Sequence, residues 1–153
     1  VIQPDGKIVV AGYCDNGASD DFAVVRYLSN GSLDTSFSTD GVTLISFSSV
    51  DDRGHSLALQ FDGKIVIGGY TGATHRFAVT RLNTNGEVDI TFATLGKAIL
   101  NIANVDDIAY GLAIQPDGRI VLAGQSTSAS GDDNFGLVRL NNNAWIFTPL
   151  IRH

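Results

Sequence analysis

The residues best suited to chemistry lie in one short stretch of the chain. His55 and Ser56 follow closely on Asp52, and together they are the three residue types of a Ser-His-Asp hydrolase. Neighbouring side chains on a strand point to opposite faces, which works against the hydrogen bond that a serine nucleophile needs from its histidine base. The chain also has no Gly-x-Ser-x-Gly elbow. An esterase-like hydrolase site near His55 is therefore the alternative interpretation, and not the first.

Paired carboxylates raise the question of a hard cation. Asp51-Asp52 and Asp106-Asp107 recur along the chain, and Ca²⁺ takes about six to eight oxygen ligands. With Tyr110, these four residues are the candidates for a ligand or metal site at a channel mouth. No carboxylate spacing typical of a Ca²⁺ loop is present, so we expect the pairs to cap turns and predict no cofactor, with Ca²⁺ as the alternative.

Other polar residues give weaker signals. Acidic loops at 15–21 and 130–134 are replaced by a Gly-Ala-Thr-His-Arg segment at 72–76, so we interpret them as solvated loops. His75 and His153 have no cysteine partners and predict no zinc site. The single cysteine, Cys14, cannot form an internal disulfide.

The elements that position these residues belong to an internal repeat. Gln3-Pro4-Asp5-Gly6-Lys7-Ile8-Val9 returns in near-identical form at 60–66 and 115–121, and the last two copies are 55 residues apart. Phe22-Ala23-Val24-Val25-Arg26 returns at 77–81 and 135–139. Each Asp-Gly is expected in a tight turn, where glycine supplies the positive φ.

Each period predicts four strands. The first covers 55–60 and 110–115, and is truncated at the start of the chain. The second, at 7–12, 64–69 and 119–124, is continuously apolar, so we expect it to be buried on both faces. The third begins at Phe22 and its copies, and the fourth covers 42–47 and 97–102.

One such meander cannot cover both of its faces, so neighbouring sheets must stack. The tight turns favour antiparallel hairpins, and the predicted fold class is an all-β, β-propeller-type repeat with three four-stranded antiparallel blades. The blades cover 1–54, 55–109 and 110–153. After residue 143 the pattern fails, but the tail 144–153 has the apolar residues for a last strand.

Two recurrent sets of side chains are expected to be structural. Arg26, Arg81 and Arg139 recur, and an aspartate follows the first two by eight residues, which predicts a pairing across a turn. The recurrent phenylalanines are predicted to form the core between blades: Phe22, Phe37, Phe77, Phe92 and Phe135.

The combination of these motifs, from residue 1 to about 143, resembles the bacterial delta-60 repeat family, which is treated as β-propeller-like. The resemblance implies an interaction scaffold, found in extracellular or surface proteins. It brings no catalytic residues.

Charge and composition exclude some classes of binding partner. The net charge of −6 and the scattered Lys and Arg argue against nucleic acid, and no apolar run reaches the roughly 18 residues of a membrane span. We therefore expect a soluble, non-enzymatic module that displays loops for a protein, glycan or other ligand. Because three blades cannot close, we also expect a homodimer that forms a six-bladed ring.

Overall fold

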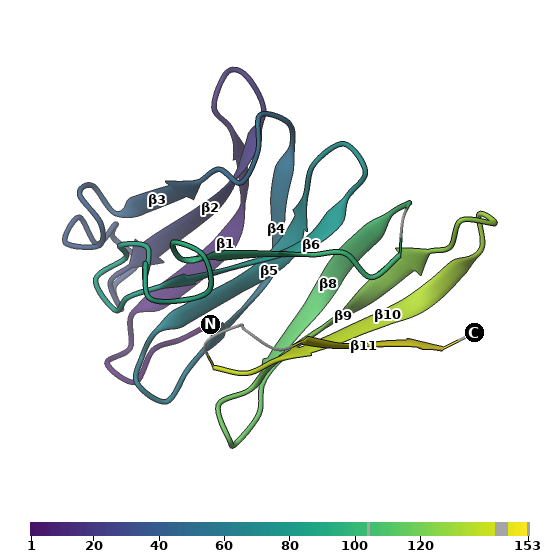
Figure 1. The fold of residues 1–153 in the computed structure, drawn as a ribbon. Helices are drawn as coiled ribbons and strands as arrows, with labels where there is room; N and C mark the ends of the chain where they lie inside the picture. Colours follow the sequence, from purple (N-terminus) through teal and green to yellow (C-terminus); the bar gives the residue numbers. More distant parts are fainter. Residues whose placement is uncertain (104, 143–146, 153) are drawn as a thin grey trace.

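In the computed structural model, which describes residues 1–103, 105–142 and 147–152, the chain is entirely β structure and turns, with no helix in these ranges. Three antiparallel sheets follow one another along the chain and spread like a fan (Figure 1). The first consists of β1 (Ile8–Asp15), β2 (Asp20–Tyr27) and β3 (Val42–Ile45). The second consists of β4 (Asp52–Leu59), β5 (Ile65–Thr71), β6 (Arg76–Leu82) and β7 (Lys97–Leu100). The third consists of β8 (Asp107–Ile114), β9 (Ile120–Thr127), β10 (Asp133–Leu140) and β11 (Phe147–Arg152).

The predicted turns are confirmed. The glycines of the three Asp-Gly pairs have φ values of 83°, 82° and 82°, and the amide of each donates to the carbonyl of the glutamine three residues earlier. This geometry favours glycine because a side chain at positive φ is strained. The repeat thus sets the same hairpin at the same place in all three sheets.

The first sheet has three strands, in keeping with the truncated first strand that the sequence predicts there. Only Val1–Gln3 lie beside β1, through a single bridge between Ile2 and Ile8. The last sheet reaches four strands through the tail, where β11 pairs with β10 from Phe147 to Arg152. Positions 144–146 and 153 of the predicted tail lie outside the described residues.

The strand boundaries also shift. β4 and β8 begin three residues earlier than predicted, at Asp52 and Asp107, so the second aspartate of each acidic pair opens a strand and does not lie in the connecting loop. Both strands carry an irregularity in register, between Gly54 and Ser56 and at the same place in β8. This bulge places His55 and Tyr110 out of the regular pairing.

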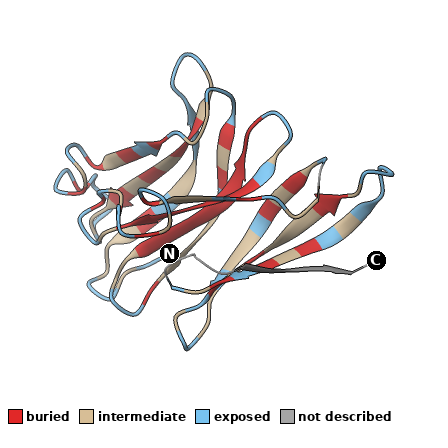
Figure 2. Ribbon diagram, in the orientation of Figure 1, coloured by how far each residue is buried: buried red, intermediate tan, exposed pale blue. Residues whose placement is uncertain are grey.

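Two cores hold the sheets together. The first lies between the first two sheets and contains Phe22, Phe37 and Ile67, and the second lies between the last two and contains Phe77, Phe92 and Leu122. Figure 2 shows that burial concentrates in the middle sheet. Every residue of β5 is buried, as the apolar run predicts, because this strand has a sheet on each side.

Burial on both faces is wrong for β1. Val10 is 48% exposed, because no sheet within the described part of the chain covers the outer face of the first blade. The prediction that Phe135 belongs to the core is also wrong, since it is 55% exposed. Its equivalents Phe22 and Phe77 each face the following sheet, and no sheet among the described residues follows the third.

Candidate functional site

Asp52, the candidate acid of the hydrolase interpretation, is fully buried and serves the backbone. Its carboxylate accepts hydrogen bonds from the amides of Phe47 and Ser48 at 2.6 and 3.0 Å, and from the hydroxyls of Ser48 and Thr71. Four donors on one carboxylate leave little capacity for a histidine. Asp52 therefore fixes the connection between the first two sheets.

Asp107 repeats this arrangement in the third sheet. It is also buried and accepts from the amides of Ile102 and Ala103 and from the hydroxyl of Ser126. The recurrence of the pattern one repeat later shows that the second aspartate of each pair has a structural task.

His55 does not form the contacts of a catalytic base. Its ring lies among the tyrosines of neighbouring strands, with centroid distances of 6.5 Å to Tyr13, 5.6 Å to Tyr70 and 5.5 Å to Tyr110. Partial burial, and secondly the charge of Arg53, lower the pKa of His55 below its ordinary value. The imidazole is thus neutral at pH 7 and packs as an aromatic ring.

The candidate nucleophile is isolated. The hydroxyl of Ser56 is buried and has no hydrogen-bond partner within the described part of the chain. It is therefore not activated by a base. The structure does not bring Asp52, His55 and Ser56 together as a catalytic triad.

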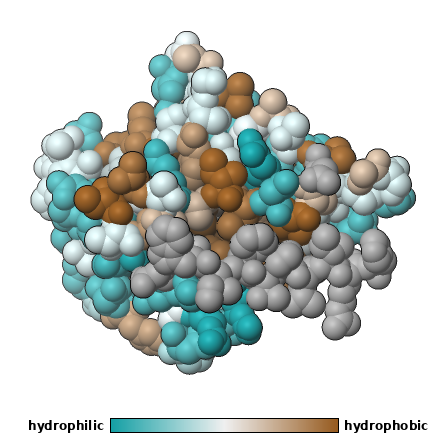
Figure 3. Space-filling model, in the orientation of Figure 1, coloured by the Kyte–Doolittle hydropathy of each residue, from teal (hydrophilic) through white to brown (hydrophobic). Residues whose placement is uncertain are grey.

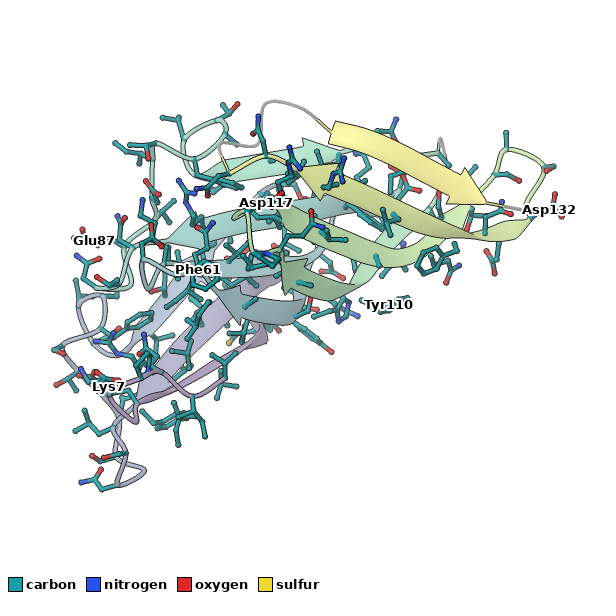
Figure 4. All side chains as sticks on the ribbon, turned by 90° about the horizontal axis from the view of Figure 1, so that it is seen from below. Lys7, Phe61, Glu87, Tyr110, Asp117 and Asp132 are labelled. Atoms are coloured by element: carbon teal, nitrogen blue, oxygen red, sulfur yellow. The ribbon has the colours of Figure 1, made fainter. Side chains whose placement is uncertain are left out.

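Of the three tyrosines around His55, sequence reasoning singled out Tyr110 and missed Tyr13 and Tyr70. Tyr13 and Tyr70 occupy equivalent places near the ends of β1 and β5, and the guanidinium of Arg53 lies 4.8 Å from the Tyr13 ring centre. Burial raises the pKa of the Tyr70 phenol. The signal was available, because Tyr13 and Tyr70 match when the copies are aligned on their Asp-Gly turns. In Figure 4, Tyr110 points away from the sheets.

The first aspartate of each pair has a different environment from the second. Asp51 is exposed and accepts from the amide of Asp20 and from Arg53, whose pKa is raised mainly by its hydrogen bond to Asp20. Asp106 lies 3.0 Å from Nδ1 of His75. Over residues 1–103, 105–142 and 147–152, no three His, Cys, Asp or Glu side chains are grouped to hold a metal ion.

The recurrent arginines pair as predicted in the first two blades. Nε of Arg26 donates to Asp34 at 2.8 Å and Nε of Arg81 donates to Asp89 at 2.8 Å. Each guanidinium also lies over a phenylalanine ring, and its Nη1 donates to a backbone carbonyl of the next blade. Arg139 is exposed, and its repeat has Phe147 at the position that matches Asp34 and Asp89.

Hydrogen bonds and nearby cations keep both aspartates charged. The pKa of Asp34 is held well below its usual value, first by the hydrogen bond from the Ser36 hydroxyl. Burial raises the pKa of Asp89, but hydrogen bonds from Thr91 and Lys64 and the charge of Arg81 outweigh it, so the net shift is also well downward. Both carboxylates are therefore ionised at neutral pH.

A shallow apolar hollow lies on the open face of the third blade. Its lining includes Tyr110, Ala123, Gly124 and Phe135. The equivalent place on the first blade is filled, because Gly54 of the second blade packs there against Gly12 and Phe22. The hollow is thus shaped like a seat for the inner strand of a further blade.

The comparisons with known proteins agree with this architecture. A family model described as a domain of unknown function (DUF5122) beta-propeller matches residues 3–37, 60–92 and 115–143. Each match begins at the glutamine before an Asp-Gly turn. No curated protein and no solved structure matches the chain. No helix in the described ranges is long and apolar enough to cross a membrane.

Proposed function

Because this chain belongs to the DUF5122 β-propeller family, we propose that it is a non-enzymatic scaffold that binds partners through its open blade faces and loops. One observation carries the proposal. The side chains that could take part in catalysis or metal binding, above all Asp52 and Asp107, accept hydrogen bonds that stabilise the strands and their connections. The outer faces of the first and third blades, in contrast, carry exposed apolar residues. The location that the family resemblance implies, outside the cell or at its surface, belongs to the same proposal.

The first partner of these faces is a second copy of the chain. The outer face of the first blade exposes Ile2 and Val10, and the open face of the third blade exposes Phe135. Figure 3 shows one side of the molecule, where hydrophobic residues also gather near the middle of the view. Contiguous apolar surface favours association.

A ring follows from the difference between the two faces. When two different surfaces of the same chain bind each other, the subunits assemble head to tail, and assembly stops only when the rotation between subunits closes a ring. Two chains supply six blades, which is within the usual range of about four to eight, whereas three chains would supply about nine, which is outside that range. A closed dimer also covers both open faces at once.

The test of assembly is the mass in solution. Sedimentation or light scattering at micromolar concentration should give about twice the 16.2 kDa chain mass. Phe135→Asp places a charge on the open face and should give a monomer. Phe61→Asp is the matched control, since Phe61 is 87% exposed in a turn away from that face, and should stay dimeric. A wild-type monomer would refute the ring.

A separate activity screen tests the hydrolase interpretation. The chain is screened with generic ester and glycoside substrates beside His55→Ala. We expect no turnover by either protein, since Ser56 lacks an activating base. An activity that the wild type has and His55→Ala loses would overturn the non-enzymatic assignment.

A further inference from the structure

A polar pocket of about 500 Å³ lies at the junction between the first two blades, at the end where the Asp-Gly turns lie. Lys7, which Figure 4 labels, marks its place. The lining of this junction pocket includes Gln3, Lys7, Arg26 and Ser36 of the first blade and Thr84 and Asn85 of the second. Polar groups that converge on one concave space are typical of a site for a small ligand.

Both walls of the junction pocket are complete within the chain. The turn from Gln3 to Lys7 forms the same two backbone hydrogen bonds as its copies at 60–64 and 115–119. The two blades that supply the walls also share one apolar core, which holds them in contact. The pocket is therefore a feature of this junction between two neighbouring blades.

The same place at the second junction is occupied by an asparagine side chain. Thr84 and Asn142 are equivalent, because the backbone carbonyl of each accepts a hydrogen bond from Nη1 of the arginine in the preceding blade, at 2.7 and 2.8 Å. Oδ1 of Asn142 also accepts from Nε2 of Gln60 at 2.6 Å and from Nη1 of Arg81 at 3.0 Å. The chain thus contains its own example of a carboxamide at this place.

The first junction has no such group, because Thr84 has a hydroxyl where Asn142 has a carboxamide. Gln3 is the equivalent of Gln60, and its Oε1 is buried without a hydrogen-bond partner in the described part of the chain. Oε1 of Gln60, in contrast, accepts from Nη1 of Arg81 at 3.3 Å. A buried carbonyl without a partner is unfavourable, so a ligand that donates an N–H to Gln3 is stabilised in the pocket.

The charges around the junction pocket are balanced, which favours a neutral ligand. Nζ of Lys7 lies 3.1 Å from the carboxylate of Asp34, and Nε of Arg26 lies 2.8 Å from the same carboxylate. Asp5 adds a second carboxylate, 3.8 Å from Lys7. Two cations thus face two anions. An anionic ligand would bring a charge without a counterion, and a carboxylate has no hydrogen to donate to Gln3.

We propose that the junction pocket binds a neutral primary carboxamide, the group that ends an asparagine or glutamine side chain. Its NH₂ group donates to Oε1 of Gln3. Its carbonyl accepts from Nη1 of Arg26, which has a second hydrogen besides the one that it donates to the carbonyl of Thr84. The site lies within one chain, so it does not depend on the proposed dimer.

The binding test uses three small molecules of similar shape: propionamide, butanone and propionate. Each is titrated into ¹⁵N-labelled protein, and the side-chain NH₂ signal of Gln3 and the Nε–H signal of Arg26 are followed by NMR. Propionamide should shift both signals saturably, with a dissociation constant on the order of 1 mM, as expected for a ligand of few atoms. Butanone lacks an N–H and propionate is charged, so both should bind at least about tenfold more weakly. Equal shifts with all three, or no saturable shift with propionamide, would overturn the proposal.

Thr84→Asn introduces at the first junction the residue type found at the second. The new carboxamide should occupy the junction pocket, raise the melting temperature by about 2–4 °C and abolish the response to propionamide. Ser29→Asn is the matched control. Ser29 is the equivalent position of the first blade, is exposed and does not line the pocket, so this variant should bind propionamide as the wild type does. A response that Thr84→Asn retains would refute the assignment.

Asn142→Thr is the reverse exchange. It removes the carboxamide from the second junction and should open a second pocket there. The side-chain NH₂ signal of Gln60 should then respond to propionamide, whereas in the wild type it should not, because Asn142 already occupies the place. A Gln60 signal that stays unresponsive in the folded variant would show that this place does not select a carboxamide.

A blocked Gly-Asn-Gly peptide distinguishes two sources of the carboxamide. A dissociation constant at least about tenfold below that of propionamide would assign the pocket to an asparagine side chain of a partner chain, and an equal one to a free small carboxamide. Gly-Asp-Gly is the control and should not bind.

The junction pocket and the dimer are tested separately. A wild-type monomer that binds propionamide removes the ring and leaves the pocket, and a dimer without binding does the opposite. Folded Phe135→Asp should bind propionamide as the wild type does. Loss of binding in that variant would overturn the assignment of the site to a single chain.

Discussion

Gly69→Ala tests whether the bulge of β4 and the glycine opposite it form a fixed joint. A Cβ on Gly69 would collide with the carbonyl oxygen of Arg53 and come within 2.8 Å of its carbonyl carbon and 2.9 Å of Cα of Gly54. Real Cβ contacts stay beyond 3.0 Å. All three atoms belong to backbone in a paired strand, so none can rotate away, and the two strands must separate.

The magnitude follows from the cost of overpacking. Steric insertion into a packed interior costs about 1–3 kcal/mol and sometimes more, and here it strikes backbone, so we expect about 3 kcal/mol. The entropy that alanine removes from the unfolded chain offsets only about 0.4–1 kcal/mol. For a chain of this size, 3 kcal/mol corresponds to a melting temperature lower by roughly 6–12 °C.

The assay is urea unfolding of Gly69→Ala beside Gly12→Ala, its equivalent in the first blade. Gly12→Ala should leave the free energy of unfolding unchanged or raise it by up to about 1 kcal/mol, since only the entropic gain applies. Equal losses in the two variants would refute the reasoning, because the backbone of the inner strand would then not be the cause. A loss below about 1 kcal/mol in Gly69→Ala would do the same.

Three further outcomes are expected. Arg81→Met should lower the free energy of unfolding by about 2 kcal/mol, because the buried Asp89 then keeps only Lys64 as a cationic partner and the hydrogen bond from Nη1 to Asn142 is lost. Arg139→Met should change the free energy of unfolding by no more than about 0.5 kcal/mol, because Arg139 is exposed. Urea unfolding measures both. The lowered pKa of Asp89 contributes stability that is fully present above the ordinary aspartate pKa of about 3.9 and is lost as the pH falls further. Melting temperatures between pH 7 and pH 3 should therefore fall less steeply in Asp89→Asn than in the wild type, and parallel curves would contradict this. Excess chelator should lower the melting temperature by no more than a few degrees, since no metal-holding group occurs in the described ranges, and a larger drop in calorimetry would revive the acidic pairs as Ca²⁺ sites.

Local sequence was sufficient for the turns, the strand types and the repeat. Asp-Gly between two apolar runs permits few backbone solutions, so the positive φ at Gly6, Gly63 and Gly118 was predictable. The pairing of Arg81 with Asp89 was predictable as well, because both residues recur with the fold. These features depend on residues close in sequence.

The exposure of residues on the first and last blades could not be predicted from the sequence of one repeat, because it depends on how many blades stack. Phe135 has the sequence of a core residue and Val10 that of a doubly buried strand, but each lies on a face that no described sheet covers. The sequence predicts that the acidic pairs cap turns, but it does not predict the full burial of Asp52. Two of the donors that hold its carboxylate, the amides of Phe47 and Ser48, are backbone groups that carry no sequence signal.

The guanidinium groups of Arg26 and Arg81 have a consequence for cooperativity. Each binds an aspartate of its own blade through Nε and a carbonyl of the next blade, Thr84 or Asn142, through Nη1. Stability in such an array accrues at each junction between neighbours as well as within each unit. Of the three described units, the middle one has a neighbour on each side, so we expect it to open last. Closing the array into a circle adds one junction without adding a unit, and leaves no end from which unfolding can start.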